Sequence, residues 1–125
     1  LAAPHHRVFN MYGPTEATVT AAAYQVTGEE PGPAAPIGRP IWNTRLYVVG
    51  PGLRLCPPGV VGQLCIAGVG VARGYLDDPD RSRQAFVSDP FTTTGRMFRT
   101  GDLARLMPDA DLVELVGRQE QGQAR

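Results

Sequence analysis

Short hydrophobic runs alternate along this chain with turns rich in glycine and proline, a pattern that predicts strands joined by tight connections. The β-branched and aromatic run at 45–50 predicts one strand, and the apolar run at 61–67 predicts another. Because side chains alternate along a strand, Leu64 and Ile66 should lie on one face and Cys65 on the other.

Two further strands are expected at 97–107 and 111–118, joined by a turn at 108–109. The best candidate for a helix is 79–86, where proline takes the first helical position after a capping Asp78. The C-terminal half is therefore expected to be mainly strand, with one short helix.

The N-terminal part, 8–24, opens with the apolar pair Val8 and Phe9 and turns at the glycine and proline of 13–14. A stretch of threonine, alanine and valine follows, which fits either a second strand or a short helix. Residues 27–36 read as a solvent-facing loop. Together the segments predict a small, mostly antiparallel β unit that carries one helix.

Composition narrows the possible functions. The chain has 125 residues, with 15 glycines and 12 prolines, which favours strands and turns over a helical bundle. Twelve basic residues balance twelve acidic ones, so no bulk charge favours a nucleic acid or an anionic membrane as partner. No apolar run is long enough to span a bilayer. All basic residues are arginine, so this chain cannot supply a catalytic lysine.

The chain opens at Leu1 without a methionine, and we expect an internal start, with the natural N-terminus missing. Two cysteines, Cys56 and Cys65, lack the spacing of a zinc site. Free thiols are expected, and a disulfide between them stays open as the alternative.

The run NMYGPTE at 10–16 carries several groups that suit a nucleotide. Its Gly-Pro turn exposes backbone amides, and the Thr15 hydroxyl can donate to a phosphate oxygen. One carboxylate, Glu16, is enough for Mg²⁺ when phosphates supply further oxygens. Tyr12 offers a flat face to a purine, and Asn10 an amide to its edge. The alternative reading is a polar turn that ends a strand.

Three other motifs are ambiguous when each is taken alone. In the turn 100–102, Asp102 could accept hydrogen bonds from a ribose diol or could stabilise its own turn. Arg118, after a glycine, could reach ribose or phosphate oxygens or could lie on the surface. The glycines of 62–76 do not have the spacing of a dinucleotide loop, and we interpret them as sites of close backbone packing.

Taken together, the motifs are more specific than any one of them. Their order is NMYGPTE, PIGRPIWNTRLYVV, GQLCIAGVGVARGYL, FRTGDLARL and VGR. This order resembles the adenylation domain of nonribosomal peptide synthetases, in the superfamily that also holds acyl-CoA synthetases and luciferases. The resemblance covers about residues 8–121. It implies an α/β superfamily fragment: the end of the large α/β lobe, then a mostly antiparallel, distorted β-barrel-like subdomain with one short helix.

The resemblance also implies roles for individual residues. Thr15 and Glu16 would be catalytic, with Thr15 at the α-phosphate of ATP and Glu16 as the ligand of Mg²⁺. The remaining nucleotide contacts would come from Asn10, Tyr12, Gly13, Asp102 and Arg118. The amino-acid side chain would be met by Met11, Val19 and Thr20.

In that family the domain activates an amino acid as its adenylate and loads it onto the phosphopantetheine thiol of a peptidyl carrier domain. A condensation domain is a further partner, and the synthetase serves secondary metabolite biosynthesis. Residues 1–125 would then be a partial adenylation domain in the cytoplasm, without the phosphate loop and the C-terminal lobe. By itself such a chain should not catalyse adenylation. Two alternatives stay open: a non-catalytic scaffold or interaction module with the same fold, and a fragment of an acyl-CoA synthetase.

Overall fold

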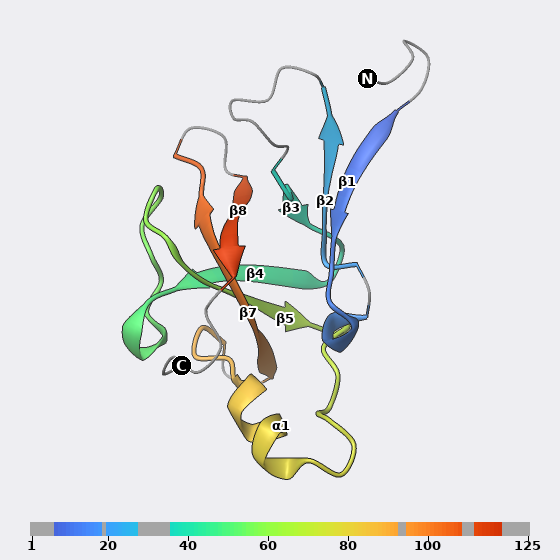
Figure 1. Ribbon diagram of the computed structural model, residues 1–125, viewed down its shortest axis with the longest axis vertical. Coiled ribbons are helices and arrows are strands. Elements are labelled where there is room, and N and C mark those ends of the chain that lie inside the picture. The colour runs from blue at the N-terminus through green and yellow to red at the C-terminus, as the bar shows by residue number, and fades with distance from the viewer. Residues whose placement is uncertain (1–6, 19, 28–35, 93–94, 109–111, 119–125) are drawn as a thin grey trace.

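The computed structural model describes residues 7–18, 20–27, 36–92, 95–108 and 112–118 (Figure 1). The expected loop at 27–36 and the end of the turn at 108–109 fall largely outside these residues. In chain order the elements are β1 (Val8–Tyr12), η1 (Thr15–Ala17), β2 (Ala22–Val26), β3 (Arg39–Pro40), β4 (Thr44–Val49), η2 (Pro51–Leu53), β5 (Gly62–Gly68), α1 (Pro79–Ala85), β6 (Phe86–Ser88), β7 (Arg96–Leu106) and β8 (Val113–Arg118).

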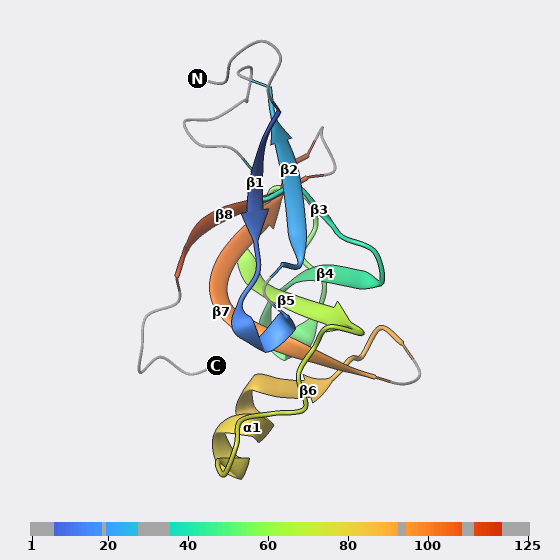
Figure 2. The same ribbon diagram turned by 90° about the vertical axis from the view of Figure 1, so that its right-hand side faces the viewer.

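The strands form two sheets, and every described strand pair is antiparallel. One sheet has the order β1-β2-β3, and the other has β4-β5-β7-β6, with β8 paired to β7. The three-stranded sheet stands at one end of the molecule and α1 at the other (Figures 1 and 2). The expected antiparallel architecture with one short α-helix is confirmed, and the described strands do not close into a barrel.

Strand β5 is the centre of the core, because six of its seven residues are buried. Leu64 packs in a cluster with Ala22 and Ile37 from the region of the smaller sheet, whereas Cys65 packs with Val49 and Met97 in a second cluster. The expected alternation of side chains along this strand is therefore confirmed. Both faces are covered, which explains why β5 is apolar from Leu64 to Ala67, while the buried Gln63 is a polar residue with a side-chain hydrogen bond.

Helix α1 begins as the sequence predicts. The Asp78 carboxylate caps it by accepting a hydrogen bond from the backbone N–H of Arg81 at 3.1 Å, and Pro79 follows the cap. The helix ends one residue earlier than expected, since Phe86 is extended and pairs with Phe98 of β7. Their rings lie 5.1 Å apart, so packing on β7 outweighs continuation of the helix.

Two strands were not expected from the sequence, β3 and β6, which have two and three residues. Each is too short to show a periodic pattern. The ambiguous stretch after the Gly-Pro turn contains both alternatives, a single 3₁₀ turn at η1 and then the strand β2.

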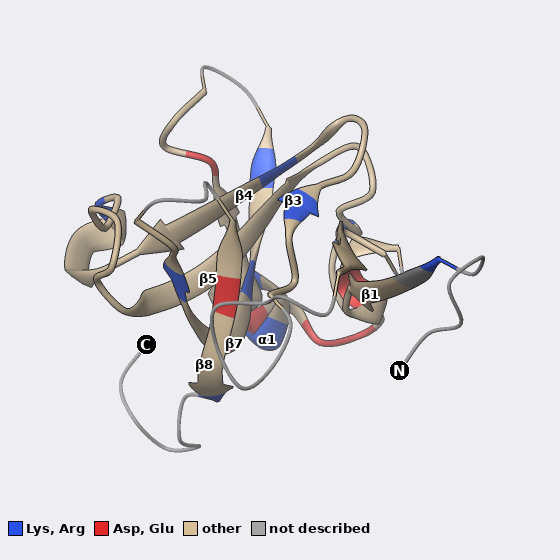
Figure 3. Cartoon of the chain, turned by 90° about the horizontal axis from the view of Figure 1, so that it is seen from above, with Lys and Arg blue, Asp and Glu red and all other residues tan. Residues whose placement is uncertain are grey.

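Both cysteines are free, as expected, with Cys65 buried and Cys56 half-buried. Acidic and basic positions are interspersed over the described elements (Figure 3). In the described part of the chain, no helix has the length and apolarity that a membrane crossing requires.

Gly38, directly before β3, provides a test of close backbone packing against β2. Its φ is +91°, and a Cβ there would lie 2.1 Å from the carbonyl oxygen of Ala23. Gly38 also accepts a hydrogen bond from the N–H of Val113. We expect Gly38→Ala to lower the free energy of unfolding by about 2–4 kcal/mol in urea denaturation.

Gly52→Ala is the matched control, because Gly52 also has a positive φ, +70°, but no neighbouring atom within 4 Å of the added Cβ. It should cost only the backbone strain, about 1 kcal/mol. Equal losses in the two variants would contradict the role of close packing at Gly38.

Candidate functional site

A bulge in β7 sets the position of Asp102. Gln63 pairs with Leu103 and Cys65 with Arg99, so one residue of β5 faces three residues of β7, 100–102. Gly101 permits this with a φ of +78°. The Thr100 hydroxyl holds the bulge by donating to the Leu64 carbonyl at 2.7 Å and accepting from the Asp102 N–H at 2.9 Å.

The Asp102 carboxylate joins three strands. Tyr12 of β1 donates its hydroxyl to Oδ2 at 2.5 Å, and Arg118 of β8 donates from Nη1 to Oδ1 at 2.7 Å. The side chain of Asp102 is 17% exposed, against 72% for Arg118. Within the turn, the Asp102 N–H donates to the Thr100 hydroxyl, and the Asp102 carboxylate takes no part in this bond. The carboxylate instead accepts hydrogen bonds from β1 and β8.

Burial is the main reason that the pKa of the Tyr12 phenol lies above its usual value, and the hydrogen bond and negative charge of Asp102 add to it. Tyr12 therefore stays protonated and remains a donor to Asp102 throughout the neutral range.

Glu16 lies in η1, directly after the Gly-Pro turn that ends β1. Its Oε2 accepts a hydrogen bond from the Tyr75 hydroxyl at 2.6 Å. The segment between β5 and α1 runs against η1, where the Ala72 N–H donates to the Glu16 carbonyl at 2.8 Å and Thr18 Oγ1 donates to the Gly70 carbonyl at 2.5 Å. These contacts fix Glu16 relative to the segment that leads from β5 to α1.

The glycines of this segment allow close backbone contact, as the sequence predicts. A Cβ at Gly68 would lie 2.2 Å from the carbonyl oxygen of Asn43, and one at Gly70 would lie 3.2 Å from that of Ala17. No wider side chain fits at Gly68 without moving a backbone.

Tyr75 is held on several sides. The Arg81 guanidinium lies 3.9 Å from the centre of its ring, and the ring of Phe86 meets it edge-on at 5.3 Å. Its backbone N–H donates to the Ser82 hydroxyl at 2.7 Å. Burial, followed by the hydrogen bond and charge of Glu16, raises the pKa of the Tyr75 phenol to about 12.

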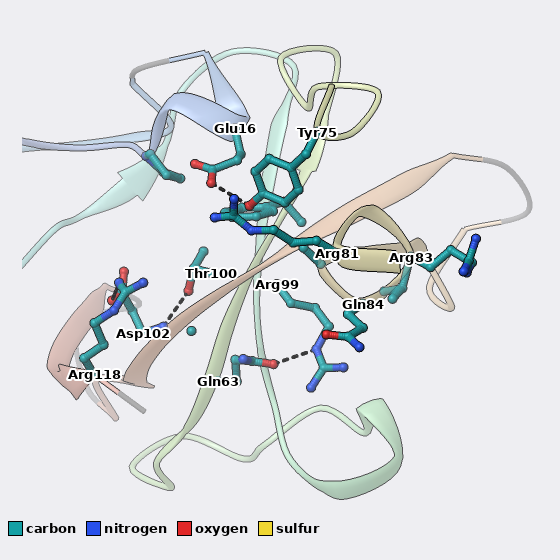
Figure 4. A pocket seen from close by; sticks show the side chains of 15 residues that line it. Glu16, Gln63, Tyr75, Arg81, Arg83, Gln84, Arg99, Thr100, Asp102 and Arg118 are labelled. Carbon is teal, nitrogen blue, oxygen red and sulfur yellow. Dashed lines mark hydrogen bonds and ion pairs between the residues drawn. The ribbon is translucent and has the colours of Figure 1, made fainter. Parts of the chain in front are cut away.

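A pocket of about 670 Å³ opens between η1, α1 and the bulge of β7 (Figure 4). Glu16 and Tyr75 line one end, and Asp102 and Arg118 line another. Its polar lining suits a polar, charged ligand better than an apolar one.

The sequence-predicted residues fall into two groups. Glu16, Asp102 and Arg118 line this pocket, and Tyr12 touches it through Asp102. The others are not among the lining residues: Asn10, Met11, Gly13, Thr15 and Thr20. Val19 lies outside the described residues.

Residues outside the pocket have distinct environments. The Asn10 amide donates to the Pro36 carbonyl at 2.9 Å, which ties β1 to the segment before β3. Met11 is 62% exposed, and the Thr15 side chain is also exposed.

Several lining residues were not singled out in the sequence, above all Tyr75, Arg81, Arg99 and Gln63. Tyr75 belongs to the ARGYL run, and Arg99 directly precedes the Thr-Gly-Asp turn. Their position in or beside a motif is the one sequence feature that indicates a place in the site. Arg81 lies on a helix with no such motif, and only the packing of α1 brings it to the pocket.

Comparison with known proteins identifies the family of this chain. A family model described as AMP-binding enzyme matches residues 2–76. The dimodular nonribosomal peptide synthase of Bacillus subtilis (strain 168) is 52% identical over 116 residues, which are 91% of this chain and 5% of that protein. Bacitracin synthase 1 of Bacillus licheniformis is 43% identical, over 93% of this chain and 2% of that protein.

Solved structures give the same result. Holo-PA1221, described as a nonribosomal peptide synthetase protein with adenylation and carrier (PCP) domains, superposes with a TM-score of 0.87 at 31% identity, over 94% of this chain and 21% of that chain. The nonribosomal peptide synthetase FmoA3 gives a TM-score of 0.83 at 38% identity, over 92% of this chain and 12% of that chain.

The chain therefore belongs to the AMP-binding enzyme family. Within this family it corresponds to a segment of a nonribosomal peptide synthetase adenylation domain, as the order of its motifs indicates. These relatives favour the peptide-synthetase reading over an acyl-CoA synthetase.

The environment of Tyr75 predicts that its phenol ionises at a higher pH than an ordinary tyrosine. Its folded-state pKa is raised from 10.0 to about 12, so the stability that this group contributes is complete below pH 10 and is lost as the pH rises towards 12. In a titration of tyrosinate absorbance, part of the signal of the folded protein should appear at higher pH than in the urea-unfolded chain.

Tyr75→Phe should remove one late-ionising group, and Glu16→Gln should lower the pKa of Tyr75, because the negative charge beside the phenol is gone. Tyr47→Phe is the control, since its hydroxyl lies near Asp89 instead. An unchanged titration in Glu16→Gln would contradict the contact between Glu16 and Tyr75.

Proposed function

We propose that this chain provides part of the ATP and Mg²⁺ site of a domain that activates an amino acid as its adenylate for transfer to a carrier-domain thiol. One observation carries the proposal: Glu16, after β1, and Asp102, in β7, line a single pocket although they are far apart in the sequence. Both come from the motifs that carry the family resemblance.

Asp102 is the proposed acceptor for the ribose hydroxyls, because its carboxylate lines the pocket and each oxygen can accept a further hydrogen bond beside the one from Tyr12 or Arg118. Arg118, which pairs with it and is largely exposed, would donate to the same sugar. Tyr12, Asn10 and the Gly13 backbone would border the adenine. The contact between Tyr12 and Asp102 supports this, since it joins the proposed base and sugar positions.

Glu16 fits a role as the protein's ligand for Mg²⁺. Tyr75 contacts one of its oxygens, and no described residue forms an ion pair with this carboxylate. In the described part of the chain, no cluster of three or more His, Cys, Asp or Glu could hold a metal. A single carboxylate suits Mg²⁺ bound mainly through substrate phosphates and water. The ion would neutralise charge on those phosphates.

The reaction needs positioning and charge stabilisation from this chain and no covalent nucleophile. The amino-acid carboxylate forms a bond to the α-phosphorus while the bond to pyrophosphate breaks. Thr15 is the proposed hydrogen-bond donor to the α-phosphate, whose oxygens carry the developing charge. Met11, Val19 and Thr20 are the proposed contacts of the amino-acid side chain.

The partners belong to the same proposal: an amino acid, ATP, a peptidyl carrier domain with its phosphopantetheine, and a condensation domain. The presence of adenylation and carrier domains together in PA1221 supports this set. The chain spans 5% or less of the two curated relatives described above, so the phosphate loop and the C-terminal lobe would come from other parts of such proteins.

Calorimetric titration of the purified chain with ATP tests the site. With Mg²⁺ present, weak binding is expected, and Asp102→Asn and Glu16→Gln should each weaken it about tenfold. Removal of Mg²⁺ should weaken ATP binding to the unchanged chain but make little difference in Glu16→Gln, because that variant has already lost the ligand.

Glu114→Gln is the matched control, since Glu114 of β8 pairs with Arg105 of β7 and is not among the pocket-lining residues. Absence of ATP binding by a folded chain, or equal binding by all the variants, would contradict a preformed nucleotide site.

A second test concerns catalysis. Since no lysine is present, we expect the purified chain to show no amino-acid-dependent exchange of pyrophosphate into ATP. Measurable exchange would show that this segment alone completes the reaction.

A further inference from the structure

The segment 69–78, which leads from β5 to α1, belongs to no helix or strand (Figure 1). Several of its carbonyl groups accept hydrogen bonds from side chains outside the segment instead. Thr18 Oγ1 donates to the Gly70 carbonyl, and the Ser82 hydroxyl donates to the Tyr75 carbonyl at 3.3 Å. The position of this segment therefore depends on the side chains that satisfy its backbone.

Arg96, at the start of β7, binds two of these carbonyl groups at once. Its Nη1 donates to the Arg73 carbonyl at 2.6 Å, and its Nη2 donates to the Ala72 carbonyl at 2.8 Å. Both distances are in the range of strong hydrogen bonds from a charged donor. Among the described residues, no ion pair includes Arg96, so its guanidinium is committed to this stretch of backbone.

The side chain of Arg96 is itself supported by β6. Its backbone pairs with Ser88 of that strand, and its guanidinium carbon lies 5.6 Å from the centre of the Phe86 ring. The ring of Phe86 also meets the ring of Tyr75 edge-on at 5.3 Å. One aromatic ring thus contacts both the arginine that holds the segment and the tyrosine that the segment carries.

The two carbonyl groups that Arg96 binds lie next to the contacts with Glu16. Ala72, which accepts from Arg96, donates its own N–H to the Glu16 carbonyl at 2.8 Å. Tyr75, two residues beyond Arg73, donates its hydroxyl to Glu16 Oε2 at 2.6 Å. The segment therefore contacts Glu16 at both its backbone and its carboxylate, and Arg96 holds the stretch from which both contacts are made.

We propose that Arg96 is a positioning residue for Glu16: its guanidinium holds the backbone at 72–73 and, through it, the two contacts that orient the Glu16 carboxylate at the pocket. Arg96 is not among the pocket-lining residues, so it acts through the segment and not by touching a ligand. The consequence for Mg²⁺ rests on the proposed function, in which Glu16 binds the ion. The holding of the segment does not rest on it.

Amide hydrogen exchange, measured by NMR on the purified chain, tests the holding of the segment. Arg96→Met keeps an unbranched stem but removes every donor, so the segment can leave Glu16 more often. Exchange of the Ala72 amide should become about tenfold faster relative to the amides of β5, which report the stability of the core. No change at Ala72, or an equal rise in β5, would overturn the proposal.

Arg105→Met is the matched control, because Arg105 lies on the same strand but pairs with Glu114 and does not bind the segment. It should leave the exchange of the Ala72 amide unchanged. Arg96→Lys keeps the charge but lacks the planar pair of donors, so it should restore part of the protection. Protection as low in Arg96→Lys as in Arg96→Met would contradict a role for the charge.

Calorimetric titration with ATP, with and without Mg²⁺, tests the consequence for the ion. Arg96→Met should reduce severalfold the gain in ATP affinity that Mg²⁺ brings, part of the way to Glu16→Gln, and leave binding without metal unchanged. Faster exchange at Ala72 with an undiminished gain would overturn the role of Arg96 in orienting the carboxylate.

The two proposals fail in distinguishable ways. If the unchanged chain does not bind ATP, the proposed function is contradicted, and the exchange of the Ala72 amide alone decides whether Arg96 holds the segment on Glu16. If ATP binds and depends on Glu16 but neither readout responds to Arg96→Met, the nucleotide site stands and the positioning role is overturned.

Discussion

The carboxylate of Asp102 is the contact on which the arrangement of the site depends. It receives hydrogen bonds from Tyr12 of β1 and Arg118 of β8, while its own strand, β7, runs through the larger sheet. One side chain thus joins the two sheets at the pocket. It can do so because the bulge at Gly101 takes this part of β7 out of the regular ladder.

The second end of the pocket is organised by backbone contact. The segment after β5 approaches η1 closely enough for Ala72 to bond the Glu16 carbonyl, and Gly70 lies in this approach, where a Cβ would be 3.2 Å from the Ala17 carbonyl oxygen. Tyr75 then reaches the Glu16 carboxylate and in turn supports Arg81. Close backbone contact at Gly70 thus accompanies the approach of this segment to Glu16.

Local charge differs from total charge in this protein. The balanced composition gives no indication of the excess of guanidinium groups in the pocket. Arg81 and Arg99 lie on different elements, α1 and β7, and neither spacing nor composition links them. Folding places both in the lining of one pocket.

Much of the fold follows from the sequence alone: the central strand β5, the pair β7 and β8, and the capped start of α1 each have a local signal of alternation, turn or cap. The motif residues Glu16 and Asp102 could also be named in advance. Three non-local features come from tertiary packing: the short strand β6, the contact of Tyr75 with Glu16, and the arginines of the pocket. These depend on packing between distant segments, which leaves no periodic pattern in the sequence to be read.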